Sequence, residues 1–180
     1  MTNWTSAFEP LDAIRLLGAL EIHRVRFVLV GGLAALAHGF TGLTQDADAV
    51  PAYDEDNLAR LCDALIGLDA KLYAHPARSD LGDDGAPPES TAFEFSAAAL
   101  RSRTSWQFVT AAGPLDILFA IDGPGGFESL APRAVTRVVS GHELLVISLD
   151  DLIESKEATG RDKDLRALGE LRRLRDHRKE

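Results

Sequence analysis

The chain has 180 residues, with 28 acidic and 19 basic side chains and a formal net charge of −9 at pH 7. A chain of this length buries about 70% of the surface that its unfolded form exposes, so it needs no disulfide or structural metal to stabilise a small core. The acidic balance excludes indiscriminate binding to nucleic acid, which requires a basic surface. The single cysteine, Cys62, cannot form an internal disulfide and fits a reducing compartment.

The N-terminal residues 1–9 lack a basic region followed by an apolar run, so no secretory signal is expected. The longest apolar stretch, 27–37, is too short to cross a bilayer, which needs about 20 residues. We therefore expect a soluble, cytoplasmic protein with no membrane partner. Residues 161–180 hold eight Lys or Arg against five Asp or Glu, and the other 160 residues carry −12. A basic C-terminal helix is able to hold RNA or a triphosphate, although a solvated arginine-rich face explains the same charge.

The first half of the chain alternates helices and short strands. Apolar residues at helical spacing predict a helix over residues 10–24. A β-rich apolar run at 26–30 predicts a buried strand, which Gly31-Gly32 breaks before a short helix from Leu33 to His38. Residues 46–50 predict a second strand, stopped by Pro51. Asp54 caps the next helix, whose leucine stripe ends at 68. Residues 75–90, rich in Pro, Gly and acidic side chains, predict a long loop.

The second half is predicted to add strands and then end in helices. Residues 104–111 and 115–121 read as strands that a turn at Gly113-Pro114 joins, and a short helix follows at 127–130. Residues 134–139 and 143–147 flank Ser140-Gly141 and predict a hairpin. Ser148 caps a helix over 149–159, and a basic helix covers 162–178. We expect one mixed α/β domain over residues 1–180, with a core at 25–147 and a helical C-terminal segment at 148–180.

Three aspartates stand out in this pattern. Side chains alternate across a strand, so Asp46 and Asp48 are expected on one face, with Ala47 opposite. Neighbouring carboxylates repel each other unless a cation lies between them, and Mg²⁺ prefers carboxylate oxygen and bridges to substrate phosphates. Asp116 interrupts an apolar strand, where a buried charge is expensive unless it is paired or metal-bound. The alternatives are a surface loop or cap for the Asp46–Asp48 pair and a water-facing Asp116.

Gly31-Gly32 precedes the carboxylates, at the junction of a strand and a helix. Glycine allows the backbone to approach a phosphate closely, and the start of a helix offers free N–H groups. An ordinary turn is the alternative. A third carboxylate on a neighbouring strand would complete a site for two metal ions, of which one activates an acceptor hydroxyl and the other steadies the leaving pyrophosphate.

Four segments, in order, resemble a known family. The run Phe27-Val-Leu-Val-Gly-Gly-Leu-Ala-Ala-Leu-Ala-His-Gly39 with Thr44-Gln-Asp-Ala-Asp48 looks like the opening of polymerase-β-type nucleotidyltransferases. Within that superfamily it is most similar to the AbiEii-like group, which includes bacterial toxin–antitoxin nucleotidyltransferases. Pro114-Leu-Asp-Ile-Leu118 resembles the strand with the third carboxylate. The family's C-terminal segment is resembled by Asp151-Leu-Ile-Glu-Ser-Lys156 and Gly160-Arg-Asp-Lys-Asp-Leu165.

The resemblance implies a mixed sheet flanked by helices, dependence on Mg²⁺ or Mn²⁺, and a nucleoside triphosphate as substrate. It implies that Asp46, Asp48 and Asp116 bind metal and act in catalysis, with Asp116 as candidate activator of the incoming hydroxyl. The residues implied to contact or support the triphosphate are Gly31, Gly32, Thr44, Lys156, Arg161 and Lys163. Many members have Gly-Ser where this chain has Gly31-Gly32, and Thr44 is the candidate source of the missing hydroxyl.

Three functions fit this resemblance. The first is transfer of a nucleoside monophosphate to an RNA such as the 3′ end of a tRNA, by the toxin of a toxin–antitoxin pair. The second is a minimal antitoxin-type enzyme that adenylylates a partner protein. The third is a degenerate fold that binds a nucleotide or a partner protein without catalysis, suggested by the small residues Ala47 and Ala49 beside the carboxylates.

Overall fold

The computed structural model describes residues 9–73, 90–91 and 93–177, so nearly all of the predicted loop at 75–90 lies outside the described residues. In chain order the elements are α1 (Ala13–Ile22), β1 (Phe27–Val30), α2 (Gly31–Ala37), β2 (Ala47–Pro51), α3 (Glu55–Gly67), β3 (Lys71–Tyr73), β4 (Ser90–Thr91), α4 (Ala97–Arg101), β5 (Ser105–Thr110), β6 (Gly113–Leu118), α5 (Phe127–Leu130), η2 (Ala131–Arg133), β7 (Val135–Val139), β8 (His142–Val146), α6 (Leu149–Thr159) and α7 (Asp162–His177).

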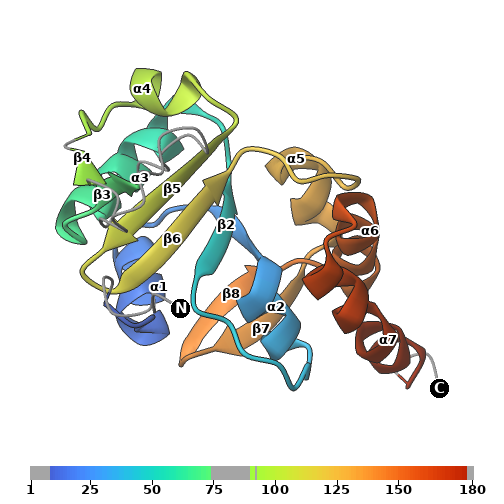
Figure 1. Cartoon of the computed structure of the whole chain (residues 1–180). Coiled ribbons are helices and arrows are strands. Elements are labelled where there is room, and N and C mark those ends of the chain that lie inside the picture. Colours follow the sequence, from blue (N-terminus) through green and yellow to red (C-terminus); the bar gives the residue numbers. More distant parts are fainter. Residues whose placement is uncertain (1–8, 74–89, 92, 178–180) are drawn as a thin grey trace, which may run out of the picture.

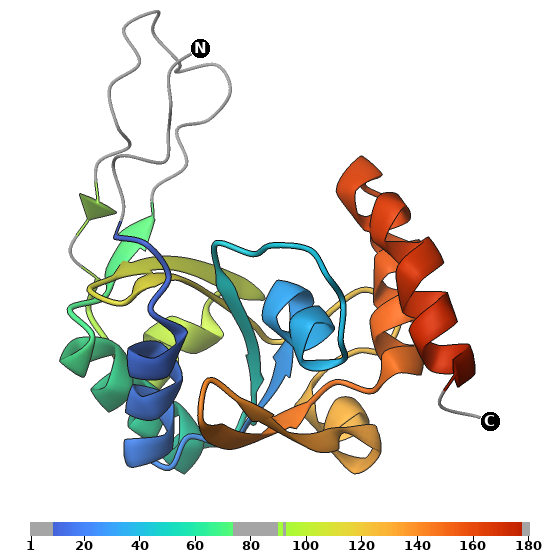
Figure 2. The same ribbon diagram turned by 90° about the horizontal axis from the view of Figure 1, so that it is seen from below.

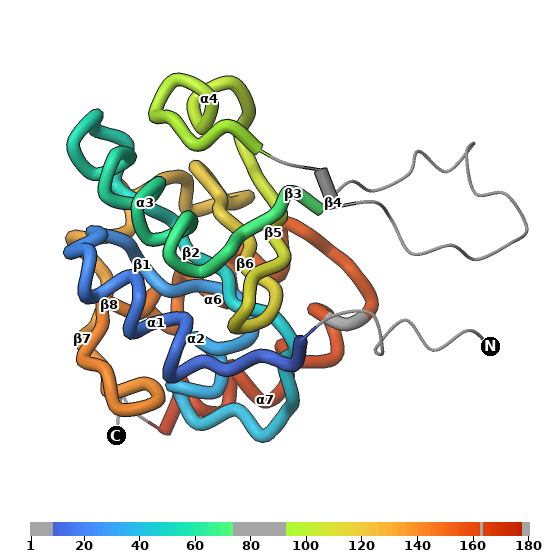
Figure 3. Tube along the Cα trace, turned by 90° about the vertical axis from the view of Figure 1, so that its left-hand side faces the viewer, coloured from blue at the N-terminus to red at the C-terminus, as the bar shows by residue number. Residues whose placement is uncertain are grey.

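The described strands form one mixed sheet in the order β4-β3-β5-β6-β2-β1-β8-β7 (Figure 1). At its centre β2 runs antiparallel to β1 and parallel to β6, whereas β5 and β6 form an antiparallel pair. The sheet lies between α1 and α3 on one side and α6 and α7 on the other, as Figures 1 and 3 show. Seen from below, α2 stands between the sheet and this helical pair (Figure 2). This arrangement confirms the predicted mixed α/β architecture.

The central strands turn one face to the core and the other away from it. Along β6, Leu115 and Ile117 are fully buried, whereas the alternating Asp116 and Leu118 are half-buried. Strand β5 alternates in the same way, with Trp106 and Phe108 buried and Gln107 exposed. Because side chains alternate along a strand, the apolar residues build the core and the polar ones share the opposite face.

Side-chain caps fix where the helices begin. The Asp54 carboxylate accepts the backbone N–H of Asn57, and Ser148 Oγ accepts that of Asp151, so both predicted caps are confirmed. Asp151 is buried, and Ser148 Oγ donates to its Oδ2 at 2.9 Å. The Arg133 guanidinium also binds this carboxylate, at 3.1 Å from Nε, and the hydrogen bond raises the pKa of Arg133. The start of α6 is thereby tied to the segment before β7.

Most of the predicted elements are confirmed with shifted ends, and the hairpin at Ser140-Gly141 is found as β7 and β8. Three predictions are wrong. Helix α2 begins at Gly31 itself, not after the glycine pair. Pro51 is the last residue of β2, paired with Phe27, instead of stopping the strand before it. Asp46 lies in the bend before β2, because strand pairing starts only at Ala47, opposite Leu115 of β6.

A fourth correction concerns the turn between β5 and β6. The chain reverses at Ala111-Ala112, where Thr110 pairs with Gly113, and Gly113-Pro114 already belongs to β6. Gly113 has a φ of +99°, and a Cβ there would lie 2.6 Å from the Leu11 Cα, so close backbone approach explains this glycine. No helix in the described part of the chain is long and apolar enough to cross a membrane.

Candidate active site

Asp48 of β2 and Asp116 of β6 lie side by side. They are register partners in the parallel β2–β6 pair, so their Cα atoms are separated by one strand spacing of about 5 Å. Both side chains are half-buried. On the other side of Asp116, its register partner in β5 is Gln107, whose Nε2 donates to Asp116 Oδ2 at 3.2 Å. Strand register therefore sets two carboxylates and one amide in a row across three strands.

Gly31 lies directly against this row. Its φ is +66°, and a Cβ at this position would lie 1.9 Å from Asp48 Oδ2 and 2.5 Å from Asp48 Cγ. Since real Cβ atoms do not approach other atoms this closely, any side chain at residue 31 must displace the carboxylate or the backbone. The position thus requires glycine for two reasons, the backbone conformation and the contact with Asp48.

Asp46 is held by the loop that leads into β2. Thr44 Oγ1 donates to Asp46 Oδ1 at 2.8 Å, and a Cβ at Gly32 would lie 2.2 Å from the same hydroxyl oxygen. Thr44 therefore fills the space above Gly32 and orients the Asp46 carboxylate. Although Asp46 lies outside the strand, it lines the same pocket as the other two aspartates.

The pocket has a volume of about 1110 Å³ and brings together nearly all of the site residues that were predicted from the sequence. Those lining it are Gly31, Gly32, Thr44, Asp46, Asp48, Asp116, Lys156 and Arg161. Lys163 belongs to α7, but its side chain is not among those that the structure describes. The sequence did not identify Gln107, Phe40, Asp122 or Ser155, which also line the pocket. Gln107 alone had a usable signal, its place on the exposed face of a strand paired with β6.

The C-terminal helical pair, α6 and α7, supplies the remaining wall of the pocket. Lys156 Nζ of α6 lies 2.7 Å from Asp164 Oδ1 of α7, and these side chains are only 16% and 9% exposed. The loop after α2 is tied to the same pair, because Thr41 N and Thr41 Oγ1 donate to Glu170 Oε1 at 2.9 and 3.0 Å. Arg161, at the start of α7, is exposed at the pocket rim.

The oxygen donors of the site suit a divalent cation only in part. Among the described residues, no group of three or more His, Cys, Asp or Glu side chains is arranged to hold a metal ion by itself. Mg²⁺, however, is usually bound through one or two carboxylates, with water and substrate phosphates as its other ligands. The adjacent Asp48 and Asp116 fit that coordination, whereas Asp46 is engaged by Thr44. A three-carboxylate ligand set therefore stays a prediction.

No family model matches this sequence, and no curated protein resembles it significantly in sequence. Solved structures do resemble it. The lincosamide antibiotic adenylyltransferase LnuA with lincomycin bound superposes with a TM-score of 0.58 at 12% identity, over 92% of this chain and 99% of that chain. The antibiotic-resistance factor ANT(2'')-Ia superposes in its solution structure with a TM-score of 0.52 at 14% identity, over 92% of this chain and 88% of that chain.

The crystal structure of ANT(2'')-Ia in complex with adenylyl-2''-tobramycin gives the same TM-score, 0.52, at 13% identity, over 91% of this chain and 92% of that chain. These likenesses extend over nearly the whole of each chain. They confirm the predicted polymerase-β-type nucleotidyltransferase fold. They do not confirm the narrower resemblance to the AbiEii-like group. This chain therefore has the fold of these two antibiotic-modifying proteins.

Proposed function

We propose that the protein is a metal-dependent nucleotidyltransferase, which moves a nucleoside monophosphate from a nucleoside triphosphate to a hydroxyl group and releases pyrophosphate. The observation that carries this proposal is the register pairing of Asp48 with Asp116, directly against Gly31, in the pocket. Two adjacent carboxylates repel each other, and a bound cation offsets this repulsion.

The triphosphate is proposed to lie between the strand edge and the helical pair. Gly31 and Gly32 present backbone without side chains there, which allows phosphate oxygens to approach closely. Arg161 lines the pocket and supplies positive charge, and Lys156, although paired with Asp164, is proposed to donate to a phosphate oxygen as well. Lys163, on the first turn of α7, is proposed to assist them. Thr44 is proposed to supply the hydroxyl that the glycine pair lacks, by turning to a phosphate oxygen the proton that it donates to Asp46.

A bound Mg²⁺ or Mn²⁺ would neutralise phosphate charge and favour the ionised acceptor hydroxyl. Asp48 and Asp116, together with Asp46, are proposed to hold it. Asp116 accepts the proton of the acceptor hydroxyl, and Gln107 orients its carboxylate through the 3.2 Å hydrogen bond. The hydroxyl oxygen forms a bond to the α-phosphorus, the bond from that phosphorus to the bridging oxygen breaks, and pyrophosphate leaves.

The acceptor that we propose is an RNA, such as the 3′ end of a tRNA, and the biological role is that of a toxin in the cytoplasm with a cognate antitoxin protein. The sequence resemblance to AbiEii-like proteins supports this role. The solved neighbours are a lincosamide antibiotic adenylyltransferase and an enzyme in complex with adenylyl-2''-tobramycin, which makes a small-molecule acceptor the second candidate. Adenylylation of a partner protein is the third possibility that the test must separate.

The small residues that suggested the non-catalytic alternative have a packing explanation. Ala47 and Ala49 are 0% and 1% exposed, on the face of β2 that is packed into the core. Their small size therefore affects packing behind the strand, while Asp48 between them lines the pocket on the other face.

The test is a transfer assay with each of the four labelled triphosphates, magnesium and, as acceptors, total tRNA, cell-lysate protein, lincomycin or tobramycin. We expect label on tRNA from the wild type and none from Asp48→Asn or Asp116→Asn. Asp63→Asn is the matched control, because this exposed aspartate of α3 lies away from the pocket. Transfer by wild type and Asp116→Asn alike, or triphosphate binding without transfer to any acceptor, would refute the proposal.

A further inference from the structure

A second, smaller pocket of about 390 Å³ adjoins the active-site pocket, and the two share Arg103 and Thr104 in their linings. Its other lining residues are Tyr53, Arg101, Ser102 and Phe119. Two segments far apart in sequence meet there, the chain leaving β2 and the chain between α4 and β5. The backbone N–H of Phe119 donates to the Thr104 carbonyl at 2.9 Å and joins the end of β6 to this region.

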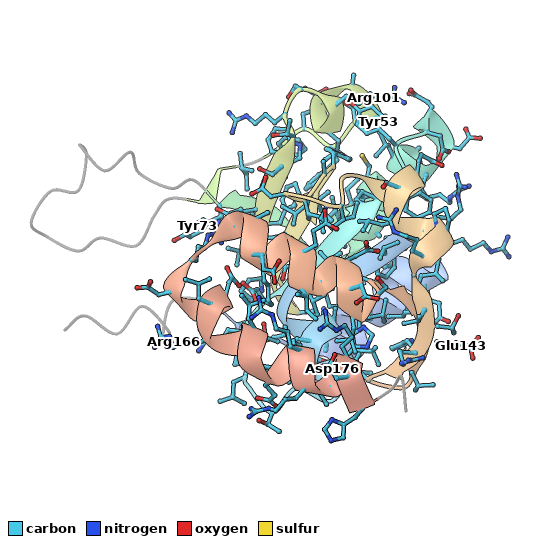
Figure 4. All side chains as sticks on the ribbon, turned by 90° about the vertical axis from the view of Figure 1, so that its right-hand side faces the viewer. Tyr53, Tyr73, Arg101, Glu143, Arg166 and Asp176 are labelled. Atoms are coloured by element: carbon cyan, nitrogen blue, oxygen red, sulfur yellow. The ribbon has the colours of Figure 1, made fainter. Side chains whose placement is uncertain are left out.

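Aromatic rings and guanidinium groups dominate the smaller pocket. The Arg101 guanidinium lies 5.4 Å from the Tyr53 ring centroid, and the two side chains are labelled close together at one edge of the molecule in Figure 4. Tyr53 meets Phe119 edge to face, at 5.0 Å between centroids, yet stays 47% exposed. Part of Tyr53 therefore stays open to another planar group, while the Arg101 guanidinium lies over its ring.

The two arginines differ in what they bind. Arg101 pairs with Glu55 and donates to the Tyr53 carbonyl, so its charge is largely satisfied within the protein. Arg103 lies with its guanidinium 5.0 Å from the Trp106 ring centroid, and in the described part of the chain it has no ion-pair partner. Arg103 is exposed at the boundary of the two pockets, where its charge is available to an anionic group.

Strand β5 connects this boundary to the proposed transfer centre. Gln107, which binds Asp116, and Ser105, two residues earlier, both lie on the exposed face of the strand. Arg103 lies in the bend before β5, and the two strand steps from Ser105 to Gln107 alone cover about 7 Å. An acceptor whose hydroxyl lies at Asp116 therefore has to extend well beyond one sugar ring to reach both Arg103 and Tyr53.

We propose that the smaller pocket binds the part of a single-stranded nucleic-acid acceptor that precedes its terminal nucleotide, with a phosphate at Arg103 and a base on Tyr53. This inference rests on the proposed function and adds a subsite to it. Arginine pairs readily with phosphate, and stacking of a base on an aromatic ring tolerates any base. A cationic acceptor would instead be repelled by Arg103.

The test measures binding of 5′-fluorescein-labelled oligoadenylates of one, two and four nucleotides by fluorescence anisotropy, with magnesium present. We expect the tetranucleotide to bind wild type about tenfold more tightly than the mononucleotide, as expected when one further base stacks. Tyr53→Ala and Arg103→Ala should each remove most of this length dependence and leave mononucleotide binding unchanged. Arg103→Ala should also reduce the slope of log affinity against log salt by about 0.7, the value for one phosphate contact on a single strand.

Conservative and distant variants separate the subsite from general effects. Tyr53→Phe keeps the ring and should bind as wild type does. Arg137→Ala removes the same charge on β7, at the opposite edge of the sheet, and should change nothing. Equal affinity for all three lengths, or equal losses in Arg103→Ala and Arg137→Ala, would overturn the inference.

Triphosphate binding, measured on the same samples by calorimetry, distinguishes the two possible failures. Should wild type bind triphosphate but no oligonucleotide, the subsite inference is wrong while the proposed function stands with a protein or small molecule as acceptor. Should wild type bind oligonucleotides with the expected length dependence but no triphosphate, the proposed function is wrong and the subsite remains.

Discussion

The floor of the pocket and its helical wall are built by different physical means. On the floor, backbone hydrogen bonds fix the register of β2, β5 and β6, so Asp48, Asp116 and Gln107 are aligned by the strands themselves. In the wall, α6 and α7 are joined by packed side chains and by the Lys156–Asp164 ion pair. The floor is therefore set by backbone geometry, whereas the wall depends on a small number of side-chain contacts, which single substitutions are able to remove.

The largest effect that we expect from a single substitution concerns the wall. Removing one partner of a buried ion pair leaves an uncompensated charge, so Asp164→Ala should lower the free energy of unfolding by roughly 3 kcal/mol. Urea denaturation measures this loss. Lys156→Met combined with Asp164→Leu should recover much of the stability but not transfer activity, because Lys156 also lines the pocket. A loss below about 1 kcal/mol, typical of exposed pairs, would show that the pair does not hold the wall.

The second effect concerns the floor. In Gly31→Ala the new Cβ must displace the Asp48 carboxylate from its position, since the present geometry leaves only 1.9 Å. A displacement of about 1 Å typically costs 10²-fold in rate, and we expect a fall of this size in kcat. Gly141→Ala is the matched control: its φ of +89° imposes similar backbone strain, but nothing lies within 4 Å of the added Cβ. If both variants keep wild-type kcat, the close contact has no catalytic role.

A smaller effect of opposite sign is expected at Gly169, an exposed glycine inside α7 with open space around its Cα. Alanine there restricts the unfolded chain and favours the helix, so Gly169→Ala should raise the free energy of unfolding by about 0.5–1 kcal/mol. Transfer activity should be unchanged, since residue 169 does not line the pocket. A stabilised variant with lower activity would indicate that motion of α7 contributes to turnover.

The last effect depends on pH and concerns a residue away from both regions. Burial in α3, with a lesser contribution from Asp63, raises the pKa of Cys62 to about 11. In the unfolded chain this thiol titrates near about 8.5, so its contribution to stability is complete below that pH and is lost as the pH rises towards 11. Urea denaturation of wild type and Cys62→Ala between pH 7 and 10.5 should show the two stabilities converging with pH. A constant difference would exclude a buried, protonated thiol.

The contrast between floor and wall also explains what the sequence predicted well. The apolar run that Asp116 interrupts predicted a strand, and the segment Asp-Ala-Asp-Ala-Val predicted its neighbour at 46–50, within one residue of β2. Likewise, Ser140-Gly141 and the cap at Ser148 are local signals, which the structure reproduces. Such features depend on residues close together in the chain, where propensity and side-chain capping decide the conformation.

The sequence did not predict the contacts between segments that lie far apart in the chain. The turn expected at Gly113-Pro114 would have paired Asp116 with Ala111, whereas the turn at Ala111-Ala112 pairs it with Gln107. Gly113 was interpreted as a turn residue, whereas the close approach of the Leu11 backbone, about a hundred residues earlier in the chain, requires glycine there. Asp46 was predicted in the strand because the alternation of side chains does not show at which residue strand pairing begins. The Lys156–Asp164 pair depends on how two helices pack, which no spacing within either helix reveals.

The Thr41–Glu170 hydrogen bonds link the second half of α7 to the proposed phosphate site. They connect the loop that follows α2 and leads to Thr44 to the middle of α7. A ligand that restrains this loop should therefore slow amide hydrogen exchange in α7 as well, through Glu170. Deuterium uptake along residues 170–177, none of which lines the pocket, would then record its occupancy, and Glu170→Gln, which weakens the link, should dampen the response.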